Sequence, residues 1–384
     1  MMNNKKKHRG LISILSFALI VAIFANASTF VKASGLNENG NDYSLLVSSD
    51  ETDAMKTAME TRGFSGRIDV EILYDCSDQP SFLLGTSGLG YQIISRGTLQ
   101  CIEGGESNPY QAYPDCKKYY GGILNYYVLI NNKLYDICRN RVVQSPSKSD
   151  YLDDAVLGLC KSGAAFSTSA SARSSITYSK IIDHASSRIQ KKAFGYNNDN
   201  TCAAVACTIA LEYLDYENPY IVPSNYHLEM LSTNDPANIA TDSPKAHAFH
   251  RFLADDCYMG PISFGDAITF GIDMYRQSSS TISNTDIDCT WTLNIYTNFG
   301  INELLADRPI LLTSTIAPPY NVHTMAVYGY RRYDDNSLEW LVHSGWYSSL
   351  IYDYDNGCYR MPEIWVAAST ATLLYRFTYD GMDD

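Results

Sequence analysis

The chain has 384 residues, 45% of them hydrophobic and only 18% charged, which allows a large buried core and excludes a wholly disordered protein. The formal net charge is −13, so the chain lacks the basic excess with which nucleic-acid-binding proteins neutralise phosphate, and we expect no nucleic-acid partner. The ten cysteines form no CxxC pair and no Cys/His cluster at zinc spacing, which argues against a structural metal site.

The N-terminus carries the pattern of a secretory signal peptide. Residues 1–34 contain five basic side chains and no acidic one, and a basic cluster from Lys5 to Arg9 precedes an apolar run from Leu11 to Phe24. Its removal leaves 24 basic against 42 acidic side chains, a formal charge of −18. No later apolar segment is long enough to span a bilayer, so we expect a secreted, extracellular protein without a membrane partner. Export permits disulfides, above all among the five cysteines before residue 165.

The region after the signal peptide is rich in predicted strands. Alternating polar and apolar side chains predict strands over 69–74 and 90–95. A hairpin is predicted over 126–137, where Asn131-Asn132 supplies the turn. With a helix expected over 49–62, the region forms a small α+β unit that has no catalytic constellation.

A run of small and polar residues separates this unit from the rest of the chain. Residues 162–175 are mostly Ser, Ala, Gly and Thr, which bury little surface and order poorly, so we expect a linker or cleavage seam there. The region from about residue 176 onward is expected to open with helices and to close with strands, which is an α+β arrangement.

One helix of this second region has a clear start. Residues 197–201 supply several candidate N-caps, and residues 203–214 are apolar on nearly every face, without Gly or Pro. A helix that is apolar all round is a buried central one, so Cys202 is placed at the end of a core element, where a cleft can reach it. Further helices are predicted over 244–254, 263–275 and 301–306.

The last part of the chain is predicted to form strands, over 310–314, 323–330, 338–343 and 373–379. His323 opens the second of these strands and His343 ends the third. The polar turn between the two strands would bring both histidines to the same end of the sheet. By contrast, His247 and His250 have no third ligand nearby, and we interpret them as surface or rim residues.

Cys202, His323 and His343 together indicate nucleophilic chemistry. A cysteine in the first turn of a helix lies at the positive end of the helix dipole, and a histidine beside it stabilises the thiolate. In this interpretation His343 hydrogen-bonds one ring nitrogen of His323 and leaves the other facing the sulfur, and Trp346 shields that bond from water.

Several segments carry a family pattern. They are Asn200–Ala206 at a helix start, Pro309–Leu311 ahead of Val322–Tyr330, Val342–Trp346, Pro80–Leu84 and Gly90–Arg96. The first three resemble the papain-like cysteine peptidases, and within them the secreted bacterial zymogens of the streptopain group, whose Val-Asn-Trp-Gly-Trp is similar to Val342–Trp346. The last two resemble the propeptide of these zymogens.

The resemblance implies a papain-like two-lobed α+β fold, with the cysteine helix in a helical lobe and the histidine in an antiparallel β lobe. It implies a signal peptide at 1–34, a pro-domain at 35–165, a linker at 166–178 and a peptidase domain at 179–384. Cys202 would be the nucleophile and His323 the general base and then acid. No cofactor is implied. The expected partners are a protein or peptide substrate and the chain's own pro-domain as an intramolecular inhibitor.

Two positions depart from the family pattern. His343 stands where the family has an orienting asparagine, and Tyr196 stands where it commonly has the glutamine of the oxyanion hole. Asn197 is the nearest amide that can substitute for that glutamine, together with the backbone N–H of Cys202; Asn198 and Asn200 lie further along. Losing one oxyanion donor typically costs about 3–4 kcal/mol of transition-state stabilisation.

Two other functions fit the same residues. A cell-wall hydrolase with a Cys-His-His triad is favoured by His343, although Cys202 and His323 are 121 positions apart and such compact domains keep the pair closer. A secreted binding protein derived from a degenerate peptidase is favoured by the missing glutamine and asparagine.

Overall fold

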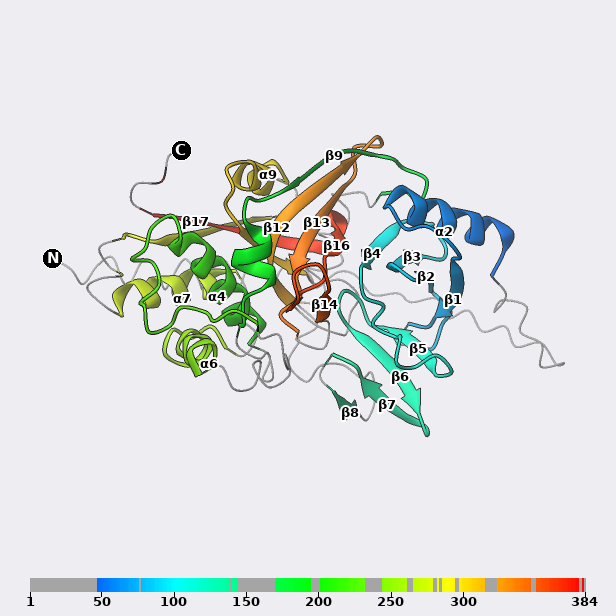
Figure 1. The fold of residues 1–384 in the computed structure, drawn as a ribbon, viewed down its shortest axis with the longest axis horizontal. Helices are drawn as coiled ribbons and strands as arrows, with labels where there is room; N and C mark the ends of the chain where they lie inside the picture. The colour runs from blue at the N-terminus through cyan, green and yellow to red at the C-terminus, as the bar shows by residue number, and fades with distance from the viewer. Residues whose placement is uncertain are drawn as a thin grey trace, which may run out of the picture.

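The computed structural model describes most of the chain from residue 47 onward. The described residues are 47–75, 77–138, 140–143, 170–194, 201–231, 244–260, 265–278, 282, 285–293, 297–314, 323–346, 350–379 and 382. The expected signal peptide lies outside them. Their fold is mixed α+β and is organised around one large antiparallel sheet, as Figure 1 shows, so the predicted fold class is confirmed at this level.

Within the described part, eleven strands form the large sheet. In order of pairing, ten of them are β1 (Asp69–Leu73), β2 (Phe82–Ser87), β3 (Gly90–Ser95), β4 (Cys101–Gly105), β16 (Ile364–Ala367), β13 (Leu338–His343), β12 (His323–Tyr333), β11 (Ile310–Ser314), β17 (Ala371–Thr378) and β10 (Asp288–Leu293). The remaining strand, β9 (Ile176–Ile181), pairs with the far half of β12, beyond the end of β11.

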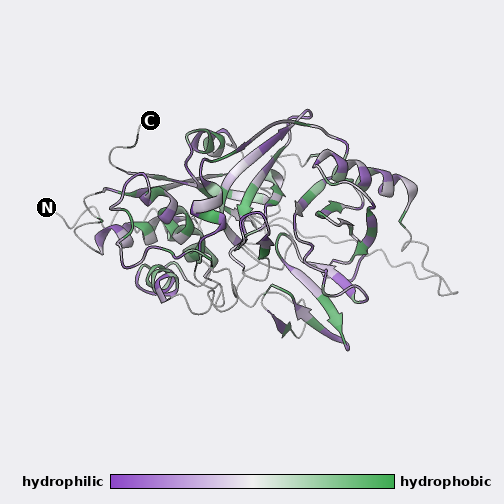
Figure 2. Cartoon of the chain, viewed as in Figure 1, coloured by the Kyte–Doolittle hydropathy of each residue, from purple (hydrophilic) through white to green (hydrophobic). Residues whose placement is uncertain are grey.

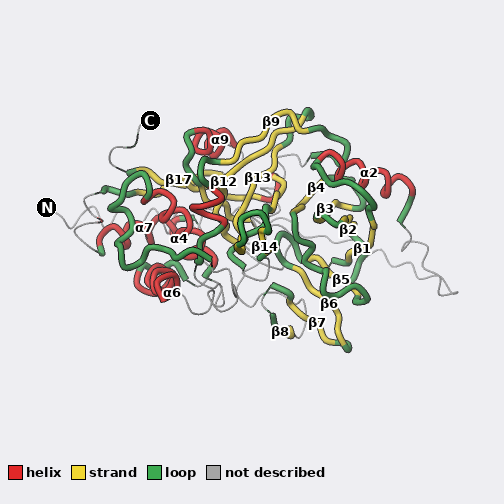
Figure 3. The backbone as a smooth tube through the Cα atoms, in the orientation of Figure 1, coloured by secondary structure: helices red, strands yellow, loops and turns green. Residues whose placement is uncertain are grey.

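The principal helices of the described part are α2 (Ser49–Thr61), α4 (Cys202–Asp215), α6 (Pro244–Arg251), α7 (Asp266–Gln277) and α9 (Thr297–Leu305). Figure 3 shows α4, α6 and α7 grouped at one end of the molecule and α2 at the other, with strands between them. The predicted helices are therefore confirmed, with shifts of a few residues at their ends.

Helix α4 is the buried central helix that the sequence predicts. Every side chain from Cys202 to Asp215 is buried except Glu212, and the helix packs against β12 and β11. Figure 2 shows hydrophobic residues gathered in α4 and the strands around it, whereas α2 is mostly hydrophilic along its outer side. Because α4 is enclosed, its first residue is held in a fixed position relative to the sheet.

Helix α2 begins with a complete capping box. The Ser48 hydroxyl accepts a hydrogen bond from the Glu51 backbone N–H, and the Glu51 carboxylate accepts one from the Ser48 backbone N–H. The helix buries Ala54, Met55, Ala58 and Met59 against β2 and β3.

Two smaller sheets flank the large one. The first contains β5 (Lys117–Tyr120), β6 (Tyr126–Ile130), β7 (Lys133–Asp136) and β8 (Arg141–Val143), and the second pairs β14 (Ile351–Asp353) with β15 (Cys358–Arg360). The predicted hairpin is confirmed between β6 and β7. Asn131 and Asn132 have φ angles of 49° and 60°, the left-handed pair that a two-residue hairpin turn requires.

The expectation that the second region opens with helices is wrong. It opens with β9, whose side chains are mostly exposed and do not alternate between buried and exposed, so the strand leaves no period-two pattern in the sequence. The expectation of a poorly ordered seam is also wrong for its described part. Ala170 and Ala172 are fully buried, and Ala172 donates a backbone hydrogen bond to Leu99.

The N-terminal part (residues 47–143) and the C-terminal part (residues 170–382) share the large sheet. Strand β4 of the N-terminal part pairs with β16 of the C-terminal part, with Gly105 opposite Ile364 and Gly104 opposite Trp365. The sheet therefore does not divide between the predicted pro-domain and the predicted peptidase domain.

The eight cysteines that the structure describes are thiols, and none of them is half of a disulfide. Cys76 and Cys160 lie outside the described residues. The described helices include none that combines the length and the apolar character needed to cross a membrane.

Candidate active site

The structure brings Cys202 to the strand that begins with His323. Cys202 is the first residue of α4, and its Sγ accepts a hydrogen bond from the backbone N–H of Thr324 at 3.4 Å. Thr324 follows His323 at the start of β12. The contact joins positions 122 residues apart in the chain, and both cysteine and histidine are at least nine-tenths buried.

His323 is held by a backbone carbonyl. Its Nε2 lies 3.0 Å from the carbonyl oxygen of Ser344, and because a carbonyl only accepts, Nε2 is the protonated nitrogen in this bond. In a neutral ring this leaves Nδ1 as the nitrogen that can accept a proton. The ring of Trp346 stacks on the imidazole at a centroid distance of 5.6 Å and an angle of 14°.

His343 does not make the predicted bond to His323. Its Nδ1 accepts a hydrogen bond from the backbone N–H of Gly345 at 3.2 Å, and its Nε2 has no partner among the described residues. The register explains the difference. His343 pairs with Ala326, and since side chains alternate along a strand, His343 shares the face of Ala326 and lies on the face opposite to His323.

His343 is a buried, neutral residue. Phe194 packs edge-on against its ring at a centroid distance of 4.2 Å, and burial lowers the pKa of His343 to about 3. The imidazole is therefore uncharged at neutral pH. It serves as packing between Phe194 and the end of β13 and does not orient His323.

His250 belongs to the surroundings of Cys202, which the sequence interpretation missed. It is buried on α6, and its Nε2 lies 2.6 Å from Oγ1 of Thr201, the N-cap residue of the cysteine helix. Burial lowers the pKa of His250 to about 4. The interpretation of His250 as a surface or rim residue is thus wrong, whereas His247 is exposed. A helical repeat was the available signal, because Ala246, Phe249 and His250 lie on one face.

The remaining predicted site residue cannot be placed. Asn197, the candidate oxyanion-hole amide, lies outside the described residues, as do Tyr196, Asn198 and Asn200. The described residues contain no group of three or more His, Cys, Asp or Glu side chains arranged to hold a metal ion.

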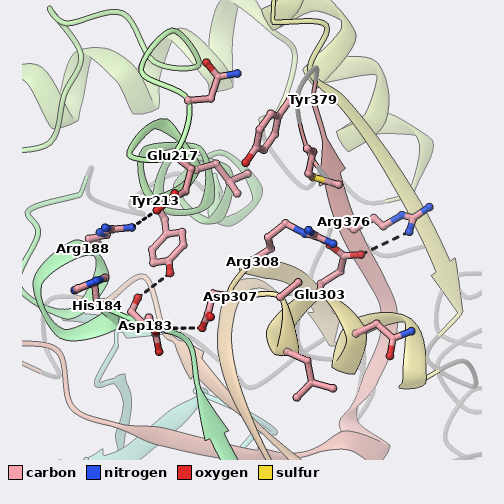
Figure 4. Close-up of a pocket in the computed structure, with 16 residues that line it drawn as sticks. Asp183, His184, Arg188, Tyr213, Glu217, Glu303, Asp307, Arg308, Arg376 and Tyr379 are labelled. Atoms are coloured by element: carbon pink, nitrogen blue, oxygen red, sulfur yellow. Dashed lines mark hydrogen bonds and ion pairs between the residues drawn. The ribbon is translucent and has the colours of Figure 1, made fainter. Parts of the chain in front are cut away.

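A large cavity lies away from this site. It has a volume of about 1320 Å³ and is lined by Tyr213, Leu214 and Glu217 near the C-terminal end of α4, about 16 Å along the helix from Cys202. Figure 4 shows that its charged side chains face one another. Arg188 pairs with Glu217, and both Arg308 and Arg376 pair with Glu303. Its lining has three arginines but four carboxylates, which include Asp183 and Asp307, so the cavity has no excess of positive charge for binding an anion.

Comparison with known proteins finds no protein-family model that matches the chain and no curated protein that matches its sequence.

Proposed function

We propose that the protein is a secreted cysteine endopeptidase, made as a zymogen, with a papain-like two-lobed catalytic region. The observation that carries the proposal is the hydrogen bond between Sγ of Cys202 and the backbone N–H of Thr324, which sets the sulfur beside the residue that follows His323. The sulfur also lies at the positive end of a 14-residue buried helix, where a thiolate is stabilised.

In the proposed reaction, Cys202 and His323 exchange one proton. Nδ1 of His323 takes the thiol proton, and the thiolate attacks the carbonyl carbon of the scissile peptide bond. The tetrahedral intermediate collapses as the imidazolium returns its proton to the leaving amine, which gives a thioester. Water, deprotonated by the same nitrogen, then hydrolyses the thioester and restores the thiol.

The orienting role falls to the Ser344 carbonyl in place of a side chain. It fixes the protonated Nε2 and supports the imidazolium that forms during the reaction, which is what the third member of such a triad does. The backbone N–H of Cys202 and the amide of Asn197 are proposed as the oxyanion-hole donors.

The alternative function, a cell-wall hydrolase with a Cys-His-His triad, loses the observation that favoured it. That alternative depended on His343 as the third catalytic residue, and His343 bonds to Gly345 on the other face of the sheet. The following test distinguishes a peptidase from the remaining alternative, a non-catalytic binding protein.

Replacement of Cys202 by alanine tests the proposal. We expect Cys202→Ala to abolish hydrolysis of a denatured protein such as casein and also any self-processing. A thiol-directed alkylating probe should label Cys202 faster than Cys207, whose pKa is raised by complete burial in the same helix. Self-processing that persists in Cys202→Ala would remove Cys202 from the mechanism. Equally slow labelling of both cysteines would favour the binding protein.

A further inference from the structure

The N-terminal part and the C-terminal part meet where β4 pairs with β16. This joint is packed like the interior of a domain. Tyr91, Ile93 and Tyr126 of the N-terminal part belong to the same buried hydrophobic cluster as Ile364 and Val366 of the C-terminal part. Separating the two parts would expose this core and also leave β4 and β16 with unpaired backbone edges, both of which are unfavourable in water.

The backbones meet unusually closely in this joint. A Cβ added at Gly105 of β4 would lie 2.8 Å from the backbone carbonyl oxygen of Glu363, just before β16. Real Cβ atoms do not approach a backbone atom so closely, so glycine is what allows β4 to pair with β16 at this point.

Among the described residues, two ion pairs cross the joint. Arg62, at the end of α2, bonds to Glu339 of β13 at 2.9 Å, and both side chains are almost completely buried. Arg360 donates two hydrogen bonds, of 2.8 and 3.0 Å, one to each carboxylate oxygen of Glu106. Burial makes the first pair much less sensitive to salt than a surface pair.

The described residues of the expected seam bind both parts. Ala170 accepts a backbone hydrogen bond from Cys101, and Ala172 donates one to Leu99 of the N-terminal part. Ser174 bonds through its hydroxyl to Asp335 of the C-terminal part. A cut before residue 170 would therefore leave the new N-terminus tied to the N-terminal part.

We infer that the N-terminal part stays bound to the C-terminal part after the chain is cut between residues 143 and 170, so that the cut protein is a two-chain unit. Its partner surface is the β16 edge with Glu339 and Arg360, and the occupant is the chain's own residues 47–143. A single cut between residues 143 and 170 then does not release the N-terminal part, and its removal requires that it be degraded in place. This inference does not depend on the catalytic proposal.

The test uses the full chain carrying Cys202→Ala, so that self-processing does not interfere. The recognition sequence of a site-specific protease is placed between residues 150 and 160, the protein is cut to completion, and the product is passed over a size-exclusion column at low micromolar concentration and again in high salt. We expect both fragments to elute together at the position of the uncut chain under both conditions. Two separate peaks at low salt would overturn the inference.

Variants of the joint then test whether its contacts hold the two fragments together. Arg62→Met removes the buried cross-joint pair but leaves Arg331, whose Nε lies 3.9 Å from Glu339, to neutralise the carboxylate, so the C-terminal part should still fold. We expect the dissociation constant of the cut fragments to rise at least about tenfold, since removing one member of a buried pair is strongly unfavourable. The matched control is Arg67→Met, which breaks only an exposed pair with Asp69 and should leave the dissociation constant unchanged.

Gly105→Ala is a second, independent variant, because its methyl group would collide with the Glu363 carbonyl. Each uncut variant is first shown by circular dichroism to be folded. If the cut fragments of folded Arg62→Met and Gly105→Ala stay together as tightly as the parent, the joint is not what retains them and the inference fails. Because every protein in the series lacks the sulfur of residue 202, a failure of the proposed catalysis has no bearing on the result.

Discussion

At the scale of single residues, the site depends on backbone groups more than the sequence indicates. The Thr324 N–H donates to the Cys202 sulfur, and the Ser344 carbonyl accepts from His323. Both contacts survive any change of the side chains at 324 and 344 that keeps the strand ends in place. This is why the absence of an asparagine at position 343 does not remove the orienting group for His323.

Thr201 and His250 give a residue-scale prediction. The Thr201 hydroxyl bonds to His250 and makes no side-chain cap to α4, although its carbonyl accepts the first helical hydrogen bond, from Val205. Thr201→Val keeps the shape and leaves a buried imidazole nitrogen without a partner, which costs about 1–3 kcal/mol. If half of that cost appears as misplacement of Cys202, its alkylation rate falls about 2- to 12-fold at neutral pH.

The measurement is the rate of Cys202 alkylation as a function of pH, with urea unfolding in parallel. Thr201→Ser retains the hydroxyl and should react at close to the parent rate. His247→Gln is the matched control, because it alters an exposed histidine of α6, the helix that carries His250. An alkylation profile for Thr201→Val that coincides with that of the parent, despite lower stability, would show that the pair supports folding alone.

At the scale of elements, three strands meet at Gly329. It lies in β12 opposite Ile181 of β9 and beside Leu341 of β13, at a bulge in the β12–β13 pairing. A Cβ there would lie 2.8 Å from the backbone carbonyl oxygen of Lys180, which cannot yield as a flexible side chain can. We expect Gly329→Ala to lower the free energy of unfolding by about 1–3 kcal/mol, measured by urea denaturation.

Gly97→Ala provides the control, because a Cβ at Gly97 meets nothing within 4 Å. It should leave the stability unchanged or raise it slightly, since alanine restricts the unfolded chain. Equal stability of the two alanine variants would mean that β9 shifts away from β12 without cost.

The same elements show what could be predicted from the sequence. Helix α4 was predictable because its apolar residues repeat locally, and the β6–β7 hairpin was predictable because Asn131-Asn132 suits its turn. The faces of His323 and His343 were not predictable. They depend on a register in which His343 pairs with Ala326, and a bulge beyond Val327 shifts that register.

Pairings between segments that are distant in the sequence could not be predicted either. Nothing near Gly105 indicates that it pairs with Ile364, and nothing near His250 indicates Thr201 as its neighbour. Such contacts are decided by how whole elements pack, whereas local patterns report only which side of an element is apolar. Cys202 and His323 could therefore be chosen as candidate residues from the sequence, whereas the contacts that surround them could not be predicted.

At the scale of the whole molecule, acid should destabilise the protein through its buried histidines. His343 and His250 are held neutral by burial, with pKa values of about 3 and about 4, against 6.5 for an ordinary histidine. Between these values the unfolded chain binds protons that the folded chain does not, so stability falls as the pH falls below about 6.5. We expect each histidine to cost about 2 kcal/mol of unfolding free energy between about pH 7 and about pH 5.

Other buried groups titrate in the same range with the opposite sign. Burial raises the pKa of Glu103 despite hydrogen bonds from Tyr91, Tyr120 and Tyr126, so the folded chain holds a proton there that the unfolded chain releases above about pH 4.5. Its contribution to stability grows as the pH falls. The histidine effect is for this reason measured as a difference between variants, in which Glu103 cancels.

The decisive comparison is the slope of unfolding free energy against pH for His343→Asn and for the parent chain. We expect a shallower slope for His343→Asn below about pH 6.5, because asparagine takes up no proton on unfolding. Phe194→Leu is the control, since it disturbs the packing against the same ring but keeps the titrating group, and it should lower the whole curve without changing its slope. Parallel curves for His343→Asn and the parent would mean that His343 already takes up its proton in the folded protein, which requires that water reach the ring packed against Phe194.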